Sequence, residues 1–307
     1  MIKIELNQEL LDKHIEEIYK SVDKLIIKIL KKKLYSKERA CLIYIKENLI
    51  NILKADNNEM KRFINYFKKN FPNVIGNINE KEKNWKRIYR IVRKDIFEKE
   101  YDNWGKRSKY GTYFFVDKIG LKTCPYCNRN YTFIVDEDSG KLRAEIDHFH
   151  PKSIYPFLAM SFYNLIPSCS ICNHTKKDKN NLNLLNPYEM QYNHFKFSYI
   201  PQKINFYILK KEKYDFNNFE IKLFGNNANL EVFKLEELYK QHKDIVLELL
   251  IKKVYYPKSY IKELKKFGFN DDEIYRYLLC NYKKDEDLHK RPLSKLIKDI
   301  SRELSLI

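Results

Sequence analysis

The 307-residue sequence contains few residues that break regular structure, with 7 glycines and 9 prolines. Collagen-like and low-complexity chains are rich in both, so these classes are excluded. The apolar runs are short and interrupted by lysines, and none approaches the roughly 20 residues that a membrane-spanning helix needs. The first residues also lack the charged-then-apolar layout of a secretion signal. We therefore expect a soluble cytoplasmic protein with no membrane partner.

The sequence has ample material for packed cores, since 44% of its residues are hydrophobic and 15% are aromatic. This composition excludes wholesale disorder. At about 100–200 residues per domain, the length corresponds to two or three folded regions.

Basic residues outnumber acidic ones, with 59 lysines and arginines against 41 aspartates and glutamates and a formal net charge of +18. Such an excess favours attraction to a polyanion, with nucleic acid as the first candidate. A genome that enriches lysine everywhere would give the same total. The excess is greatest in residues 1–100, which favours a local basic surface.

The first 110 residues show the apolar periodicity of amphipathic helices. The pattern predicts helices at about 7–33, 36–54, 58–69 and 80–104, with Asn7 capping the first of them. The last of these is strongly basic and is either a phosphate-binding helix or an ordinary solvated face. Its residues expected to contact nucleic acid are Lys86, Arg87, Arg90, Arg93 and Lys94.

From about residue 111 the sequence changes to short β-rich runs separated by turn residues. We expect strands at about 131–135, 141–146, 194–200, 203–210 and 218–224, and later helices at about 231–254, 258–266, 271–283 and 292–305. The sequence thus predicts an α+β protein. Its three regions are a helical basic region at 1–110, a core at 111–188, and a strand-then-helix region at 189–307.

Four of the six cysteines form two C-x-x-C pairs, Cys124 with Cys127 and Cys169 with Cys172. Each pair can bind one ion through two sulfurs, and four thiolates complete a tetrahedral structural zinc site. The alternative is that the four cysteines bind no metal and are incidental. Two C-x-x-C doublets among only six cysteines favour the zinc site over this alternative. We expect the remaining two, Cys41 and Cys280, to be buried thiols.

Chemically versatile residues lie between the two pairs and just after them. Asp147 and His148 are adjacent at the end of a predicted strand, where one carboxylate can hold a hard cation and one imidazole can accept a proton from water. Asn173 follows the last cysteine on a presumed helix and could add an oxygen ligand to the same ion. An all-oxygen set suits Mg²⁺ or Mn²⁺.

This arrangement resembles the HNH (ββα-metal) endonucleases that carry structural zinc. The resemblance rests on Asp147, His148, Asn164 and Asn173, nested within the cysteine pairs. It implies a zinc-clasped, treble-clef-like ββα core with His148 as general base and Asp147 as a ligand of the catalytic metal. It further implies that Asn164 orients the loop and the His148 ring. Asn173 would be the second ligand, where many members have histidine, with His174 as its rival.

Three short motifs are similar to those of HNH proteins of bacterial anti-phage systems. They are Cys-Pro-Tyr-Cys, Asp-His-Phe-His-Pro-Lys-Ser and Cys-Asn-x-x-Lys. The nuclease subunit of the Septu system, which works beside an ATPase, is an example. We also expect Lys152 or Lys176 to contact a phosphate, although either could serve the fold or the surface. The resulting hypothesis is a metal-dependent DNA endonuclease of anti-phage defence. The alternatives are an HNH-type RNase acting on tRNA or other RNA, and a non-catalytic zinc-ribbon protein that binds nucleic acid.

Overall fold

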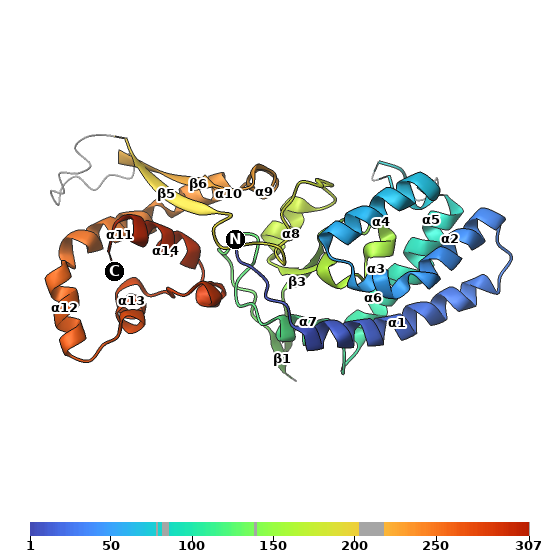
Figure 1. The fold of residues 1–307 in the computed structure, drawn as a ribbon, viewed down its shortest axis with the longest axis horizontal. Helices are drawn as coiled ribbons and strands as arrows, with labels where there is room; N and C mark the ends of the chain where they lie inside the picture. Colours follow the sequence, from blue (N-terminus) through green and yellow to red (C-terminus); the bar gives the residue numbers. More distant parts are fainter. Residues whose placement is uncertain (78, 82–85, 138–139, 203–217, 307) are drawn as a thin grey trace. The chain divides into compact units, whose positions relative to one another are not determined.

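The computed structural model describes residues 1–77, 79–81, 86–137, 140–202 and 218–306 (Figure 1). The chain divides into two compact units, each built from separate stretches of sequence. One unit, which we call the helical unit, contains Ile4–Gly120 and Phe133–Glu189. The other, which we call the C-terminal unit, contains Met1–Lys3, Leu121–Thr132 and Met190–Ile307. The region predicted as the core, 111–188, contributes residues to both.

The helical unit begins with helices whose ends follow local capping rules. The elements are α1 (Gln8–Leu30), α2 (Ser36–Glu47), α3 (Leu49–Lys54), α4 (Asn57–Asn70) and the 3₁₀ turn η1 (Pro72–Val74). The Asn7 side chain accepts a hydrogen bond from the Leu10 N–H at 3.0 Å, which satisfies a donor that the helix leaves unpaired. The cap predicted for the first helix is therefore confirmed, and α4 lies close to the predicted 58–69.

The next helical run covers most of the predicted basic helix. It consists of α5 (Arg87–Arg90), a π-helical segment η3 (Ile91–Glu98) and α6 (Lys99–Lys106), and α7 (Thr112–Ile119) follows. The prediction starts this helix at 80, but residues 80, 81 and 86 are not helical, and residues 82–85 lie outside the described residues. π-helical turns are rare and often mark functional sites, because they change which side chains face a neighbour.

A small strand–strand–helix element follows in the same unit. Its parts are β3 (Glu145–His148), β4 (Leu165–Ser168) and α8 (Ser170–Lys176), with the 3₁₀ turns η4 (Pro156–Leu158) and η5 (Phe162–Asn164) in the connection between the strands. The strands pair antiparallel, with Asp147 opposite Ile166 and His148 opposite Leu165. A separate hairpin of β1 (Val135–Glu137) and β2 (Gly140–Leu142) precedes them. The predicted ββα element is therefore present.

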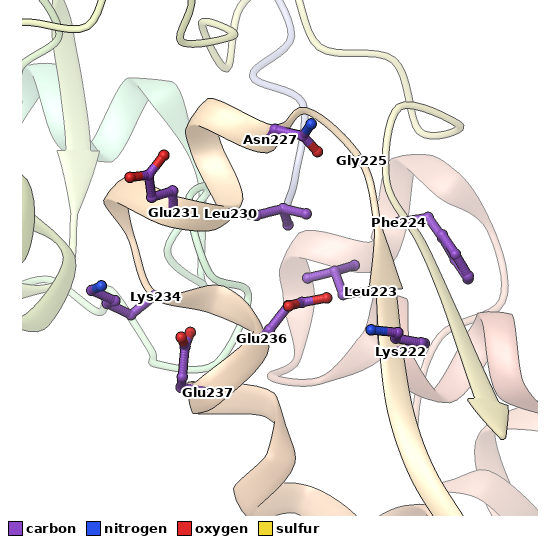
Figure 2. Close-up of a pocket in the computed structure, with 10 residues that line it drawn as sticks. All are labelled: Lys222, Leu223, Phe224, Gly225, Asn227, Leu230, Glu231, Lys234, Glu236 and Glu237. Carbon is purple, nitrogen blue, oxygen red and sulfur yellow. The ribbon is translucent and has the colours of Figure 1, made fainter. Parts of the chain in front are cut away.

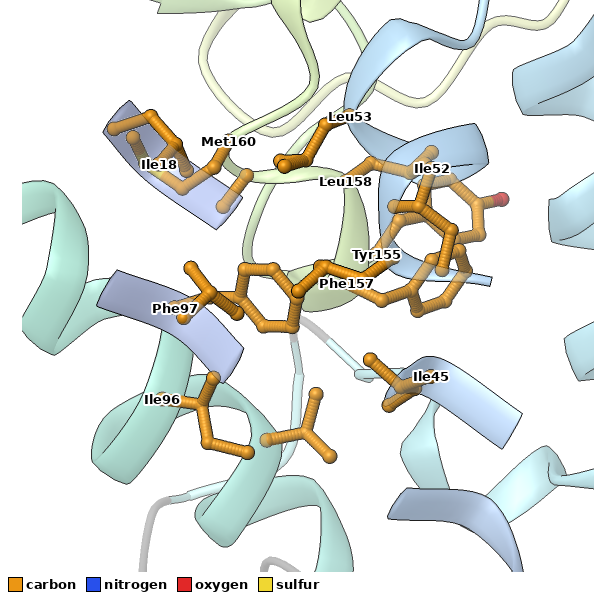
Figure 3. Packing of buried hydrophobic residues seen from close by; sticks show 14 of the residues in the cluster. Ile18, Ile45, Ile52, Leu53, Ile96, Phe97, Tyr155, Phe157, Leu158 and Met160 are labelled. Atoms are coloured by element: carbon orange, nitrogen blue, oxygen red, sulfur yellow. The ribbon is translucent and has the colours of Figure 1, made fainter. Parts of the chain in front are cut away.

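The connection between β3 and β4 is buried in the hydrophobic core of the helical unit (Figure 3). Phe157 and Leu158 are fully buried, and the Phe157 ring stacks on Phe67 of α4 with centroids 3.9 Å apart. Ile52 and Phe97, from α3 and η3, belong to the same cluster. The long loop that follows His148 is thus held by helices from the N-terminal hundred residues.

The C-terminal unit contains a second hairpin and a set of helices. The elements are β5 (Lys196–Pro201), β6 (Phe219–Phe224), α9 (Asn227–Val232), α10 (Leu235–Tyr239), α11 (Lys243–Tyr255), α12 (Lys258–Lys266), α13 (Asp271–Leu279) and α14 (Ser294–Glu303). β5 and β6 pair antiparallel, from Lys196 opposite Phe224 to Pro201 opposite Phe219. The predicted strand at 203–210 lies outside the described residues. The α+β class is confirmed.

Two further expectations can be compared with this fold. Among the described residues, no helix has the length and apolar character needed to cross a membrane. Cys41 is buried as predicted, but Cys280 is exposed, so the prediction of a buried thiol there is wrong. Cys280 adopts a left-handed conformation at the end of α13, where the chain leaves the helix and its side chain reaches solvent.

His14 of α1 is a fully buried histidine that predicts acid sensitivity. Its Nε2–H donates to the Met160 carbonyl at 2.8 Å, and Nδ1 accepts from the Tyr110 hydroxyl at 2.9 Å, so the neutral ring satisfies both partners. Burial lowers the pKa of His14 to about 4. As the pH falls below 6.5, His14 therefore becomes protonated in the unfolded chain before it does so in the folded protein.

We expect the free energy of unfolding to be insensitive to His14 above about pH 6.5 and to fall by about 3 kcal/mol from this group as the pH drops to 4. Urea unfolding at pH 7 and pH 4.5 measures the difference. His14→Gln should be less stable at pH 7 and show a shallower decline with acid. An equal decline in both proteins would contradict the assignment.

Candidate functional site

The first cysteine pair lies in a tight turn with a specific backbone pattern. The Asn128 N–H donates to the Cys124 carbonyl at 2.7 Å, and the Cys124 N–H donates to the Asn130 carbonyl at 2.9 Å. The Arg129 N–H points to the Cys127 sulfur at 3.4 Å, which favours a thiolate there. Asn128 itself has a φ of 50°, a left-handed conformation that asparagine tolerates better than most residues.

Asn128 also fixes this turn within the C-terminal unit, a role that the sequence did not reveal. Its side-chain oxygen accepts from the Lys295 N–H and from the Ser294 hydroxyl, both at 3.0 Å. Its side-chain nitrogen donates to the Thr123 hydroxyl at 3.0 Å and to the Leu288 carbonyl at 3.2 Å. The start of α14 therefore holds the cysteine turn in place.

The second cysteine pair lies at the start of α8. Cys169 is the N-cap residue and Cys172 lies one turn later, so both sulfurs face the same side. The sulfurs of Cys124, Cys127, Cys169 and Cys172 all lie within 4.8 Å of one another and are buried. A tetrahedron with Zn–S bonds of ~2.3 Å spaces its sulfurs about 3.8 Å apart, so the cluster has the donors and spacing for structural zinc.

Two polar pairs join α8 to β3. The Asn173 amide donates to Glu145 Oε2 at 2.6 Å, and Lys176 Nζ contacts Asp147 Oδ1 at 3.0 Å. Glu145 and Asp147 are two residues apart on β3 and point to the same face of the strand. Asn173 and Lys176 lie one turn apart on α8, so each can contact one of the two carboxylates. Two carboxylates, one amide and one ammonium group therefore lie together at one face of the ββα element.

The sequence did not indicate either of these pairings, Asp147 with Lys176 and Asn173 with Glu145. His174 is 71% exposed, with Nε2 at 3.6 Å from the same Glu145 carboxylate. Lys176 is fully buried and also donates to the His148 carbonyl at 2.7 Å. In this conformation Lys176 cannot make the predicted phosphate contact, because Asp147 and the backbone occupy its ammonium group.

His148 has a defined orientation at the end of β3. Its Nε2 lies 3.0 Å from the Ala159 carbonyl, and because a carbonyl only accepts, this nitrogen carries the proton. The unprotonated nitrogen of the neutral ring is then Nδ1. Burial, aided by the charges of Lys152 and Lys176, lowers the pKa of His148 well below its ordinary value. The ring is therefore neutral at pH 7 and can accept a proton at Nδ1.

Asn164 fixes the loop that supplies this carbonyl partner. Its side-chain oxygen accepts from the His150 N–H at 2.6 Å, and its side-chain nitrogen donates to the Leu158 carbonyl at 2.8 Å. Its backbone carbonyl accepts from the Phe149 N–H at 2.8 Å. Asn164 is fully buried, so these bonds are protected from water. The residue thus holds both ends of the loop between His148 and Ala159.

The His150 side chain is anchored to the helices. Its Nε2–H donates to the Asn57 side-chain oxygen at the start of α4, at 3.0 Å. Burial lowers the pKa of His150 to about 3, so the ring is neutral at pH 7. This contact gives His150 a structural role.

Tyr101 of α6 is a contact of His148 that the sequence did not indicate. The two rings lie 5.0 Å apart at an interplanar angle of 55°. Lys152 Nζ sits 4.2 Å from the centre of the Tyr101 ring, and desolvation lowers the pKa of this lysine. Tyr101 thus contacts both the imidazole and the Lys152 ammonium group. The signal was hidden because Tyr101 is brought to the site by tertiary packing and lies far from the motif in sequence.

The predicted basic helix presents its charges unequally. Lys86 and Arg90 are exposed, whereas three others pair with acids. Those pairs are Arg87 with Glu38 at 2.9 Å, Arg93 with Glu98 at 2.6 Å and Lys94 with Glu98 at 2.9 Å. Half-buried Arg93 also donates to the Tyr89 hydroxyl at 2.7 Å. Much of the local positive charge is therefore balanced within the helical unit.

A hollow of about 690 Å³ opens beside β6, α9 and α10 in the C-terminal unit (Figure 2). Glu231 and Glu237 lie along one side with Lys234, and Leu223 and Leu230 lie between the helices and the strand. In the described part of the chain, the group of three or more His, Cys, Asp or Glu side chains that could hold a metal ion is the four cysteines. We therefore assign no metal ion to the carboxylates of this hollow.

Comparisons with known proteins agree with this arrangement. The chain is 42% identical over 53 residues to the "Septu protein PtuB" of Bacillus thuringiensis, a match that spans 17% of this chain and 18% of that protein. No solved structure matches the chain. The family model of HNH endonucleases matches residues 124–179, which include all four cysteines, β3, β4 and α8. The chain therefore carries an HNH endonuclease domain at residues 124–179, and the predicted resemblance is confirmed.

Proposed function

We propose that this protein is a metal-dependent endonuclease that hydrolyses DNA phosphodiester bonds. The observation that carries the proposal is the state of His148, whose Nε2–H is held by the Ala159 carbonyl and whose Nδ1 is left as the basic nitrogen. An imidazole fixed in this tautomer at the end of β3 can take the proton of an attacking water. We assign the nuclease to residues 111–188, with 1–110 and 189–307 supporting nucleic acid and partner binding.

The residues around His148 each have a part in this reaction. Asn164 maintains the loop that carries the carbonyl partner, so the ring keeps one tautomer and one orientation. Tyr101 packs against the ring and restricts its rotation. Lys152 supplies positive charge near the imidazole and can approach a bound phosphate by leaving the Tyr101 face.

The donor set at β3 and α8 fits a hard divalent cation. Asp147 and Asn173 are the proposed ligands, with Glu145 on the same strand face and His174 as the exposed rival. Their oxygens match the preference of Mg²⁺ or Mn²⁺. Such an ion would stabilise negative charge on the phosphate and on the departing oxygen. Lys176 Nζ lies 3.0 Å from Asp147 Oδ1 and places a positive charge beside this buried carboxylate.

Defence against phage is the proposed setting, and it rests on the similarity to the Septu protein PtuB. We propose that the protein acts in the cytoplasm beside an ATPase subunit of the same system. Because the match spans 18% of that relative, the partner has to be tested directly. Co-purification of an untagged ATPase encoded nearby would support the assignment, and a fully active lone chain would count against it.

A plasmid-nicking assay tests the activity. Supercoiled DNA is incubated with the protein in Mg²⁺, in Mn²⁺ and without added divalent ion, and a labelled RNA strand is incubated in parallel. We expect cleavage of DNA only when the divalent ion is supplied. Preferential cleavage of RNA would support an RNase instead, and no cleavage of either substrate, with binding retained, would support a zinc-ribbon binding protein.

Tyr101 provides a prediction that separates orientation from binding. Tyr101→Leu removes the ring against His148, so we expect kcat to fall by about 10- to 100-fold while KM changes little. Tyr101→Phe keeps the aromatic contact and should retain most of the activity. Single-turnover cleavage of a labelled duplex measures both parameters. Equal activity of Tyr101→Leu and Tyr101→Phe would exclude the proposed positioning role.

A further inference from the structure

A second cavity, of about 430 Å³, lies in the helical unit beside α2, η1 and the start of α5. Its volume falls in the range of small-molecule sites. The floor is apolar and includes the buried residues Cys41, Val74 and Ile88. Burial raises the pKa of the Cys41 thiol to about 12, so this cysteine contributes an uncharged surface and no nucleophile.

The rim of this cavity has aromatic and basic character. Lys37 and Lys86 line it and are exposed, and Tyr35 is 72% exposed beside them. Arg87 lies with its guanidinium 5.4 Å from the Tyr35 ring. An aromatic face that stays open to solvent at the mouth of an apolar cavity is suited to stack on another planar group.

The acidic member of the lining is already engaged. Glu38 accepts from Arg87 at 2.9 Å and from the Tyr35 N–H at 3.0 Å, and it is 7% exposed. Arg87 also donates to the Lys33 carbonyl at 2.9 Å, so its guanidinium is fixed in place. The charges of Lys37 and Lys86 therefore dominate at the mouth. A ligand that complements this cavity has a planar apolar part and at least one anionic group.

We propose that this cavity binds one unpaired nucleotide of a single-stranded segment of the substrate, with its base against Tyr35 and the apolar floor. Lys37 and Lys86 would contact the adjoining phosphates. Bases in a duplex are stacked on each other and cannot enter such a cavity, whereas single strands bind by stacking on aromatic side chains along a basic surface. The proposal rests on the proposed nuclease function and adds a preference for unpaired or distorted DNA.

Hydrogen bonds connect the walls of the cavity to the HNH segment. Tyr89, next to the lining residue Ile88, donates to the Ser153 carbonyl at 2.5 Å. The Gly76 N–H, two residues after Val74, donates to the Ile154 carbonyl at 2.8 Å. A Cβ at Gly76 would clash with the Ser153 carbonyl oxygen, so this close approach requires glycine. A nucleotide in the cavity would thus be held by elements bonded directly to the loop after His148.

The test measures binding without cleavage. The full-length protein with His148→Ala is titrated against a fluorescent 12-nucleotide dT strand and against a matched duplex, without added divalent ion. Adding Tyr35→Ala should weaken single-strand binding by about 5- to 150-fold, the range for loss of one base stack, with little effect on the duplex. The matched control is Tyr255→Ala, because Tyr255 is also exposed, at 58%, but lies on α11. It should bind as the parent does.

The salt dependence provides an independent readout. Lys86→Ala should lower the log–log slope of single-strand binding against salt by about 0.7, whereas Tyr35→Ala should leave the slope unchanged. Lys28→Ala, at an exposed position of α1, is the charge-matched control for a lysine outside the lining. Equal affinities for Tyr35→Ala and Tyr255→Ala would overturn the proposal.

Competition with free dTMP distinguishes a site for a nucleotide within a strand from a site for a free nucleotide, since both ligands present a base and a phosphate. If the site serves a strand, dTMP should displace the labelled oligonucleotide only at concentrations far above its Kd for the strand. Displacement by dTMP at concentrations comparable to that Kd would overturn the assignment to a strand and indicate a free nucleotide. Because cleavage plays no part in these measurements, an inactive nuclease and an unused cavity give different results.

Discussion

Replacing His148 with alanine should lower the rate of DNA cleavage by about 10²–10⁴-fold, the range for loss of a general base. The variant loses the one imidazole at the end of the described β3 strand that presents Nδ1 as a base, with Nε2 bonded to the Ala159 carbonyl. Zinc content should stay close to that of the parent, because His148 belongs to neither cysteine pair. Single-turnover cleavage at saturating Mg²⁺ measures the loss.

The matched control for this variant is His194→Ala. His194 is exposed and lies in the C-terminal unit, where its Nδ1 accepts from the Gln191 N–H at 3.1 Å. We expect its cleavage rate to equal that of the parent. If His148→Ala cleaves as fast as His194→Ala, His148 is not the base. If His148→Ala has lost its zinc, the variant has damaged the fold and His148→Asn becomes the variant to measure.

The sequence was most informative where structure is determined locally. The Asn7 cap, the end of α4 before Pro72 and the bounds of α12 all follow from patterns spanning a few residues. The cysteine spacing was equally direct, because four thiolates have few uses other than one shared ion. The strand–strand–helix core was implied by the resemblance to HNH endonucleases.

Tertiary contacts account for what the sequence did not reveal. From the sequence, Lys176 is either a phosphate contact or a residue that serves the fold or the surface, and burial of α8 against β3 makes it the partner of Asp147. The same packing pairs Asn173 with Glu145, which lies two residues before Asp147 on β3. Tyr101 of α6 reaches His148 because the loop after β3 is packed against the helices. None of these pairings has a periodic signature, since the partners are 28 to 47 residues apart.

Loss of the structural zinc should have the largest effect on stability. Cys172→Ser removes one of the four sulfurs that lie within 4.8 Å of one another, so we expect zinc content to fall from about one to well below one per chain. Apparent zinc binding is worth about 10–16 kcal/mol in small zinc domains, which exceeds the total stability of many domains. Residues 124–179 should therefore lose their fixed structure, and cleavage should be lost with it.

Cys280→Ser is the control that isolates this effect, because Cys280 is a free, exposed thiol outside the cluster. Metal analysis by mass spectrometry, limited proteolysis and calorimetry are applied to both variants and the parent. The control should keep its zinc, its melting temperature and its protease resistance. Cys172→Ser should be cleaved within residues 124–179, because α8 carries both Cys172 and the Lys176 that pairs with Asp147. Unchanged zinc content and protease resistance in Cys172→Ser would mean that the cysteines do not hold the ion. In that case the orientation of Asp147 would depend on the α8–β3 pairs alone.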